Sequence, residues 1–328
     1  MSVIKSASLI IINSIQKQIK KNDFKVLMLK RISSSQSFAG KMVFPGGVLD
    51  KCDFNDEWNK IFNKKYNLPQ LNSLKCDKEM VIYKDSKDLS KIKPEIFYRI
   101  CAIRETFEET GILIANDKYH KPVLHNKILM KDISENHWQQ NVLKDGNLFI
   151  ELFKSYELVP DLFSLYEWSE WITPSIFNRR FHTAFYIFIS DSSVETNINE
   201  DESCSISWVI PEEIVHEPSS YKELAPPQFL ELLAMNSLFS IRDIHVAALR
   251  RQQKSGGISN MTKVISLSNG KLIVLPGDSR YPADHKDEID LSHFSFIDLE
   301  KDENLNRFFV SDGLFNFRYN LNGSNFNI

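Results

Sequence analysis

The residues best suited to chemistry are three glutamates in the segment from Arg104 to Gly111. Read as a helix, this segment places Glu105 and Glu109 on one face, about 6 Å apart along the axis, with Glu108 beside them. Carboxylates this close repel each other unless a positive charge lies among them. Because oxygen ligands suit a hard divalent cation, with magnesium as the default, the spacing predicts a metal site.

A solvated acidic helix face is the alternative interpretation, and three features argue against it. Arg104 precedes Glu108 by four residues, which places the two side chains for pairing. Gly111 stands where a left-handed residue ends a helix. The helix also has an apolar stripe that would dock it on a core, formed by Ala102, Ile103, Phe107 and Ile112.

Composition limits the partners of the chain. Its 328 residues, 42% apolar and 25% charged, fit a globular protein with one large domain or one domain plus an appendage. A formal charge of -3 gives no electrostatic reason for nucleic acid as the main partner, although a local basic patch stays open. The four cysteines have no metal-like spacing and are interpreted as reduced thiols of an intracellular protein. No run of eighteen apolar residues predicts a membrane helix.

The elements that must position the glutamates lie on both sides of them. Residues 6–14 and 24–31 are expected to form two neighbouring strands, and a further strand leads to the loop Gly46-Gly47. Helices are predicted at 137–156 and from Pro226 to about Gln253. Residues 262–275 are expected to form a hairpin with an Asn-Gly turn, followed by one strand near 308–319.

Two separated parts of the sequence resemble the Nudix box of diphosphate hydrolases. Arg-Glu-x-x-Glu-Glu-x-Gly at 104–111 is similar to its second half, and Met-Val-Phe-Pro-Gly-Gly-Val at 42–48 to the strand and glycine loop that open it. The family places a glycine fourteen residues before the arginine, and this chain has Ser90 at that position. Gly47 instead lies 57 residues before Arg104, so the box contains 43 more residues than the family pattern. A split box, together with segments 168–174, 179–185 and 226–229, resembles the animal Nudix motif 19 branch.

This resemblance implies an α/β Nudix sandwich, with a mixed sheet between helices. We expect a Nudix domain over 1–255, with an insertion inside the box at about 50–94, and a C-terminal extension over 256–328. The sandwich is expected to be extended by a C-terminal helix and the hairpin. Both a functional lid and a mobile excursion remain open for the insertion.

The resemblance also implies roles for particular residues. Glu105 and Glu109 would hold Mg2+ or Mn2+, with Glu108 in or near the same shell and oriented by Arg104. A carbonyl of the glycine loop would complete the shell; we assign Gly47 to the metal and Gly46 to the substrate side. The first half of the family's box also has a glutamate, for which Glu95 is the near candidate.

Three further sites are candidates with an alternative for each. Arg179 and Arg180 could bind substrate phosphates in bidentate fashion or be ordinary surface residues. Glu202, six residues before Trp208, is a candidate catalytic base or part of a solvated turn. Trp168 and Trp171 pack in the core or shape a pocket for a base or a pantetheine arm.

The implied reaction is metal-dependent hydrolysis of a diphosphate linkage in a small nucleotide. The motif 19 branch implies coenzyme A or acyl-coenzyme A, cleaved to 3',5'-ADP and (acyl) 4'-phosphopantetheine. The alternatives are ADP-ribose, dinucleotides or RNA caps, and, from another class, a silent nucleotide-binding module. Relatives in the branch are often peroxisomal, so the resemblance implies a peroxisomal protein. The chain lacks a C-terminal Ser-Lys-Leu signal, and the alternatives are the cytoplasm or the mitochondria. The sequence does not indicate an oligomeric state.

Overall fold

A computed structural model describes most of the chain, namely residues 3–15, 22–35, 38–66, 68–74, 78–190, 194–198, 203–217, 223–254, 257–282, 288–299, 301–311 and 314–319. The chain forms two compact units. The larger unit contains residues 5–169 and 184–258. The smaller unit contains residues 1–4, 170–183 and 259–328.

The main sheet has the strand order β10-β7-β8-β1-β2-β3, with β4 paired to β1 and β9 paired to β2. Its first two strands are antiparallel and pair Ile12 with Val26, as the two neighbouring apolar segments predict. Four consecutive residues of β1, 9–12, are fully buried, so both faces of this strand are covered. The strands are β1 (Ile4–Ser14), β2 (Phe24–Arg31), β3 (Met42–Val43), β4 (Gly46–Val48), β7 (Leu165–Ile172), β8 (Phe181–Ser190), β9 (Ser203–Val209) and β10 (Ile258–Met261).

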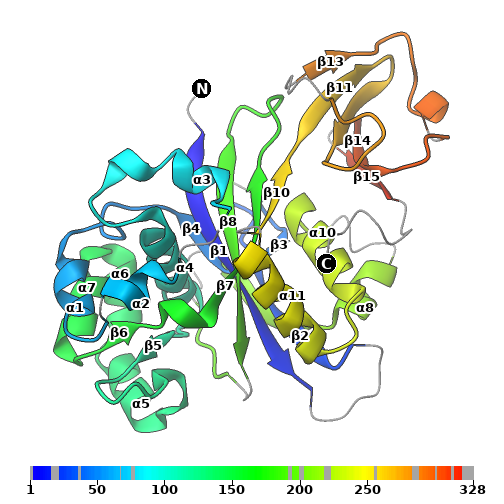
Figure 1. Ribbon diagram of the computed structural model, residues 1–328. Coiled ribbons are helices and arrows are strands. Elements are labelled where there is room, and N and C mark those ends of the chain that lie inside the picture. The colour runs from blue at the N-terminus through cyan, green and yellow to red at the C-terminus, as the bar shows by residue number, and fades with distance from the viewer. Residues whose placement is uncertain are drawn as a thin grey trace. The chain divides into compact units, whose positions relative to one another are not determined.

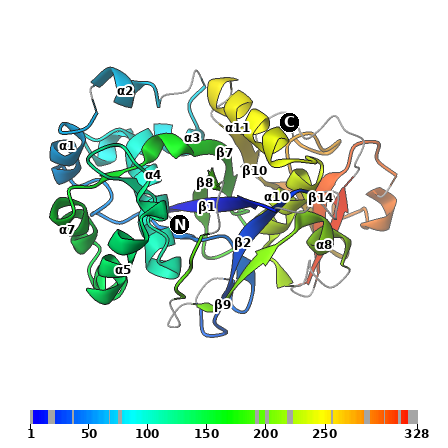
Figure 2. The same cartoon turned by 90° about the horizontal axis from the view of Figure 1, so that it is seen from below.

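Helices of the larger unit cover both faces of its part of this sheet, as Figures 1 and 2 show. One face carries α4 (Pro94–Thr110) together with α1 (Glu57–Phe62), α6 (Trp138–Lys144) and α7 (Asn147–Ser155). The other face carries α8 (Pro211–His216), α10 (Pro226–Asn236) and α11 (Ile241–Lys254). The predicted α/β sandwich is therefore confirmed.

Shorter elements complete the larger unit. The helices are α2 (Leu68–Asn72), α3 (Val81–Lys84) and α5 (Lys127–Glu135). Short 3-10 turns are η1 (Lys87–Leu89), η2 (Val123–His125) and η3 (Leu162–Ser164). Two-residue strands β5 (Ala115–Asn116) and β6 (Val159–Pro160) pair with each other.

The central helix is α4, which carries the three glutamates. Pro94 occupies its first turn, where the missing N–H of proline costs nothing. Gly111 ends it in the left-handed conformation at φ 73°, and the Gly111 N–H donates to the Phe107 carbonyl at 2.8 Å. Every residue of α4 except Glu105 is buried. Such a helix is fixed by neighbours on all sides, which suits a rigid site.

The segment between β4 and α4 is packed into the core. Trp58 is fully buried, donates from Nε1 to the Cys52 carbonyl at 2.8 Å, and packs edge-on against the rings of Phe149 and Phe153 in α7. Tyr83 is 1% exposed and donates to Glu167 at 3.1 Å. The interpretation as a mobile excursion is therefore wrong for the described residues of this segment, because its aromatic side chains are part of the domain's main core.

We expect Trp58→Ala to lower the free energy of unfolding by about 3–5 kcal/mol, because it removes a large fully buried ring. Urea unfolding followed by circular dichroism measures this. Lys60→Ala, on the same helix with its side chain 72% exposed, is the control and should change stability by less than about 0.5 kcal/mol. Equal stability of Trp58→Ala and wild type would show that the segment does not support the core.

Two predicted long helices are each broken in two. Residues 137–156 form α6 and α7, separated at Asp145 and Gly146. The predicted helix from Pro226 ends at Asn236 and resumes at Ile241, where Asp23 accepts the Ile241 N–H at 2.7 Å. Among the described residues no single helix is long and apolar enough to cross a membrane; α10 and α11 satisfy that criterion only as a pair, bent by 114°.

The smaller unit contains a five-stranded sheet in the order β13-β11-β12-β14-β15. The predicted hairpin is confirmed, because β11 and β12 pair from Lys263–Val274 to Leu267–Gly270 around the Asn-Gly turn. The single strand expected near 308–319 is instead two antiparallel strands. The elements are β11 (Lys263–Leu267), β12 (Gly270–Val274), β13 (Glu288–Asp290), η4 (Ile297–Leu299), β14 (Asn306–Ser311) and β15 (Leu314–Tyr319).

Candidate active site

The glycine loop lies directly against α4. Strand β4 pairs with β1, opposing Gly46 to Ser8 and Gly47 to Ala7. A Cβ on Gly46 would lie 2.4 Å from the Ala7 carbonyl oxygen, and one on Gly47 would lie 2.3 Å from Oε2 of Glu105. Both positions therefore require glycine because backbone and carboxylate approach so closely.

We expect Gly47→Ala to lower turnover by about 10²-fold, because the new methyl group must displace the Glu105 carboxylate. Gly47 does not have a left-handed φ, so lack of space is the only expected cause. Steady-state kinetics together with thermal unfolding separate activity from folding.

Gly40→Ala is the opposite control for this experiment. Nothing lies within 4 Å of a Cβ at Gly40, but its φ of +67° strains any other residue. This variant should lose about 1 kcal/mol of stability and keep its turnover. An active Gly47→Ala enzyme would contradict the assigned position of Glu105.

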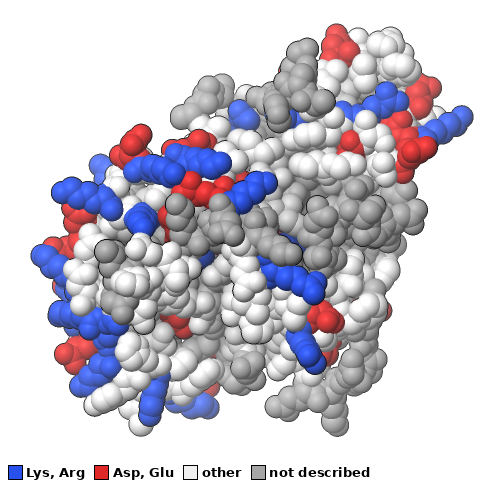
Figure 3. Space-filling view, viewed as in Figure 1, with Lys and Arg blue, Asp and Glu red and all other residues white. Residues whose placement is uncertain are grey.

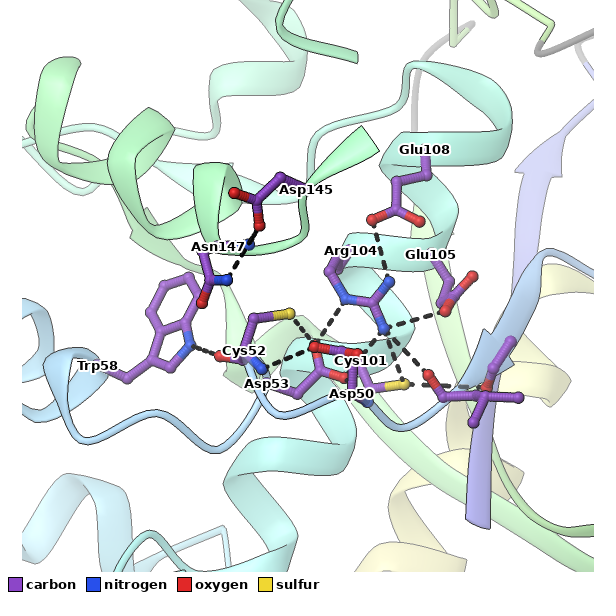
Figure 4. A network of polar contacts seen from close by, with 12 residues as sticks. Asp50, Cys52, Asp53, Trp58, Cys101, Arg104, Glu105, Glu108, Asp145 and Asn147 are labelled. Atoms are coloured by element: carbon purple, nitrogen blue, oxygen red, sulfur yellow. Dashed lines mark hydrogen bonds and ion pairs between the residues drawn. The ribbon is translucent and has the colours of Figure 1, made fainter. Parts of the chain in front are cut away.

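The guanidinium of Arg104 connects three acidic side chains at α4, as Figure 4 shows. Arg104 donates to both carboxylate oxygens of Asp53, from Nε at 2.8 Å and from Nη2 at 3.0 Å. Its Nη1 donates to Glu108 at 3.0 Å, and its Nη2 lies 3.0 Å from Oε1 of Glu105. Arg104 therefore holds three carboxylates in fixed directions, and the predicted pairing with Glu108 is present.

Asp53 is a site residue that sequence reasoning missed. Five residues separate Gly47 from Asp53, which is the family's spacing between the glycine and the acidic residue of the first half of the box. Aspartate replaces glutamate here, and the spacing alone identifies it. From this earlier part of the box, the carboxylate that pairs with Arg104 is thus Asp53.

Glu108 lies in an environment that favours its neutral form. Burial raises the pKa of Glu108 to about 8, with the negative charge of Glu105 adding to the effect and Arg104 opposing it. The backbone of the same residue is also held, because Gln139 in α6 donates to the Glu108 carbonyl at 3.1 Å and to the Asn197 carbonyl at 2.9 Å. These contacts fix the carboxyl end of α4.

Glu109 faces the glycine loop from the same helix. Its Oε2 accepts the Gly46 N–H at 2.9 Å, and its side chain is 1% exposed. Its Oε1 lies 3.6 Å from Nη1 of Arg31, at the end of β2. Arg31 is the second residue that the sequence analysis missed, and no local pattern in the sequence identifies it.

The donor set fits a hard divalent cation. Glu105 and Glu109 offer carboxylate oxygens, and the loop of Gly46 and Gly47 offers carbonyl oxygens, which are ligands that magnesium and manganese accept. Within the described part of the chain, no three histidine, cysteine, aspartate or glutamate side chains already converge as a metal-binding group. Here Glu105 pairs with Arg104, and Glu109 with the Gly46 N–H and Arg31.

Two further predicted site residues, Arg179 and Arg180, belong to the smaller unit. Arg180 donates from Nε to the Thr173 carbonyl at 3.0 Å, and the exposed Arg179 lies over the ring of Phe181 at 5.3 Å, all within the smaller unit. Their substrate role stays a prediction. Glu202 is outside the described residues.

The two tryptophans of β7 are both buried. Trp168 is fully buried and Trp171 is 6% exposed. Trp168 donates from Nε1 to Glu231 at 2.6 Å, and the guanidinium of Arg251 lies 3.4 Å from its ring centroid. These contacts support the interpretation of core packing for Trp168.

Comparisons with known proteins agree with this site. Residues 3–235 match the family described as the NUDT19 Nudix domain. The chain is 31% identical over 277 residues to acyl-coenzyme A diphosphatase NUDT19 of Xenopus laevis, covering 80% of this chain and 73% of that protein. It is 29% identical to the Homo sapiens protein of the same name, over the same shares of both chains.

A solved structure shares the fold. The Nudix hydrolase of Alicyclobacillus acidocaldarius is similar with a TM-score of 0.54 and 18% sequence identity, over 78% of this chain and 98% of that one. At this identity the likeness concerns the fold alone. The family match extends over the glycine loop, Asp53, Arg104 and all three glutamates of α4. The chain therefore belongs to the Nudix hydrolases, within the family defined by the NUDT19 Nudix domain.

Proposed function

We propose that this Nudix hydrolase cleaves the diphosphate linkage of coenzyme A or acyl-coenzyme A, giving 3',5'-ADP and (acyl) 4'-phosphopantetheine. The observation that carries the proposal is the carboxylate cluster of α4 set against the glycine loop, in a chain whose relatives are acyl-coenzyme A diphosphatases. A binding module without turnover would be expected to lack one of the glutamates, whereas this chain has all three.

Nudix hydrolases generally need a divalent metal, and we propose Mg2+ or Mn2+ for this chain. Glu105 and Glu109 would hold it, with Glu108 nearby and the Gly47 carbonyl as a further oxygen ligand. When bound, such a cation offsets charge on the diphosphate and lowers the pKa of the attacking water.

The contribution of the protein's own residues to the reaction is to position the three glutamates. Arg104, fixed by Asp53, holds Glu105 and Glu108 at defined directions on α4. The Gly46 N–H does the same for Glu109. Because these groups are ordered before substrate binds, little reorganisation is needed during the reaction.

The proposed substrate is a small nucleotide. Arg179 and Arg180 are the proposed phosphate contacts, and Glu202 is the proposed base. On the face of the molecule that Figure 3 displays, basic and acidic side chains are interspersed. A uniform basic surface, as expected for a protein that binds long nucleic acids, is not what this face shows.

Product analysis tests the proposal. Purified protein is incubated with magnesium and, separately, with coenzyme A, ADP-ribose, a reduced dinucleotide and capped RNA, each beside Glu105→Gln. Release of 3',5'-ADP from coenzyme A by wild type alone is the expected result. If another diphosphate is cleaved instead, the substrate assignment is wrong. If none is cleaved, a silent binding module is the better explanation.

A further inference from the structure

Among the described residues, two arginines contact the glutamates of α4, at different distances and with different exposure. Arg104 is 5% exposed and bound to Asp53 through two hydrogen bonds. Arg31 has a side chain that is 21% exposed and meets Glu109 at 3.6 Å, an ion-pair distance beyond that of a hydrogen bond. The contact of Arg31 with its glutamate is thus longer than the contacts of Arg104, and its side chain has more access to solvent.

The position of Arg31 follows from an irregularity in the sheet. Strand β2 pairs with β9, and the register shifts between Lys30 and Arg31. Such bulges locally re-aim a side chain. Lys30 is exposed, whereas the guanidinium of Arg31 reaches the buried carboxylate of Glu109. The strand therefore ends with a cation directed at a proposed metal ligand.

We propose that Arg31 is an internal counter-cation of Glu109 that competes with the divalent cation for this carboxylate. The inference rests on the metal site of the proposed function. Removing the positive charge of Arg31 should strengthen binding of the divalent cation for two reasons. The guanidinium and the divalent cation repel each other, and the guanidinium no longer has to be displaced from the carboxylate of Glu109. Arg31 thus sets the cation concentration at which the site fills.

The test is direct cation binding without substrate. Titration of Mn2+, followed by the loss of its free electron paramagnetic resonance signal, gives the dissociation constant for wild type, Arg31→Met, Arg31→Lys and Lys30→Met. We expect Arg31→Met to bind Mn2+ about tenfold more tightly. Arg31→Lys, which keeps the charge, and Lys30→Met, which alters the exposed neighbour, should bind as wild type does.

A dissociation constant for Mn2+ that does not decrease in Arg31→Met overturns the inference. If Arg31→Met binds Mn2+ equally or more weakly, Arg31 does not compete for Glu109 and instead supports the site. Thermal unfolding in chelator verifies folding, and Arg31→Gln is the second variant if the methionine variant does not fold. Because no substrate is present, an incorrect substrate assignment leaves this ratio of dissociation constants unaffected. Absence of Mn2+ binding by any variant would instead overturn the metal site itself.

Discussion

Glu109→Gln is expected to lower turnover by roughly 10³-fold, which corresponds to about 4 kcal/mol of lost transition-state stabilisation. The substitution keeps the shape of the side chain and an oxygen that accepts the Gly46 N–H, so it removes only the negative charge. A divalent cation loses an anionic ligand, whereas the packing of α4 stays intact. Turnover at saturating and at limiting magnesium measures the effect.

Glu95→Gln is the matched control, because it makes the same change at the other end of the same helix. Glu95 is buried, but it does not lie beside Arg104, where Asp53 is found. Its variant should keep turnover near that of wild type. A Glu109→Gln enzyme with near wild-type turnover at limiting magnesium would rule out Glu109 as a metal ligand.

Arg104→Met should have the second large effect, a loss of about 3–5 kcal/mol in the free energy of unfolding. The reason is the partner left behind, since the side chain of Asp53 is 0% exposed and would keep a buried charge without its counter-ion. Urea unfolding in the presence of a chelator measures the loss, because a bound cation would otherwise compensate. Turnover should fall as well, because Glu105 and Glu108 lose their common partner.

A double-mutant cycle separates the ion pair from the packing of the arginine chain. Adding Asp53→Asn to Arg104→Met should recover part of the lost stability, because the buried charge is removed with its partner. Lys131→Met serves as a surface control: its ion pair with Glu135 joins side chains that are 74% and 66% exposed, and its loss should cost less than about 1 kcal/mol. If Arg104→Met lost no more free energy of unfolding than Lys131→Met, the ion pairs of Arg104 would contribute little to stability.

Local patterns predicted the part of the site that is local in sequence. The helix with Glu105, Glu108 and Glu109, its glycine end and the glycine loop all depend on residues within a few positions of each other. Asp53 was missed because aspartate replaces glutamate and because 50 residues separate it from Arg104. Arg31 was missed because nothing in a strand sequence states which distant helix its last side chain meets.

Burial in the insertion between β4 and α4 could not be predicted from the local sequence either. Its polar composition and length are typical of an exposed segment, yet Trp58 and Tyr83 are buried. Their partners, Phe149 in α7 and Tyr186 in β8, lie about a hundred residues further along the chain. Burial of this kind depends on tertiary contacts that no short window contains.

The burial of α4 on all sides also concerns how the protein reaches its native state. Its neighbours come from the glycine loop, the inserted segment, α6 and the η3 turn, which are far apart in the sequence. Contacts between residues far apart in the sequence form slowly, because the chain loses the entropy of closing long loops before the contacts stabilise it. The carboxylate cluster is thus completed only when most of the larger unit has folded, so that regain of enzymatic turnover during refolding should lag behind regain of helix content.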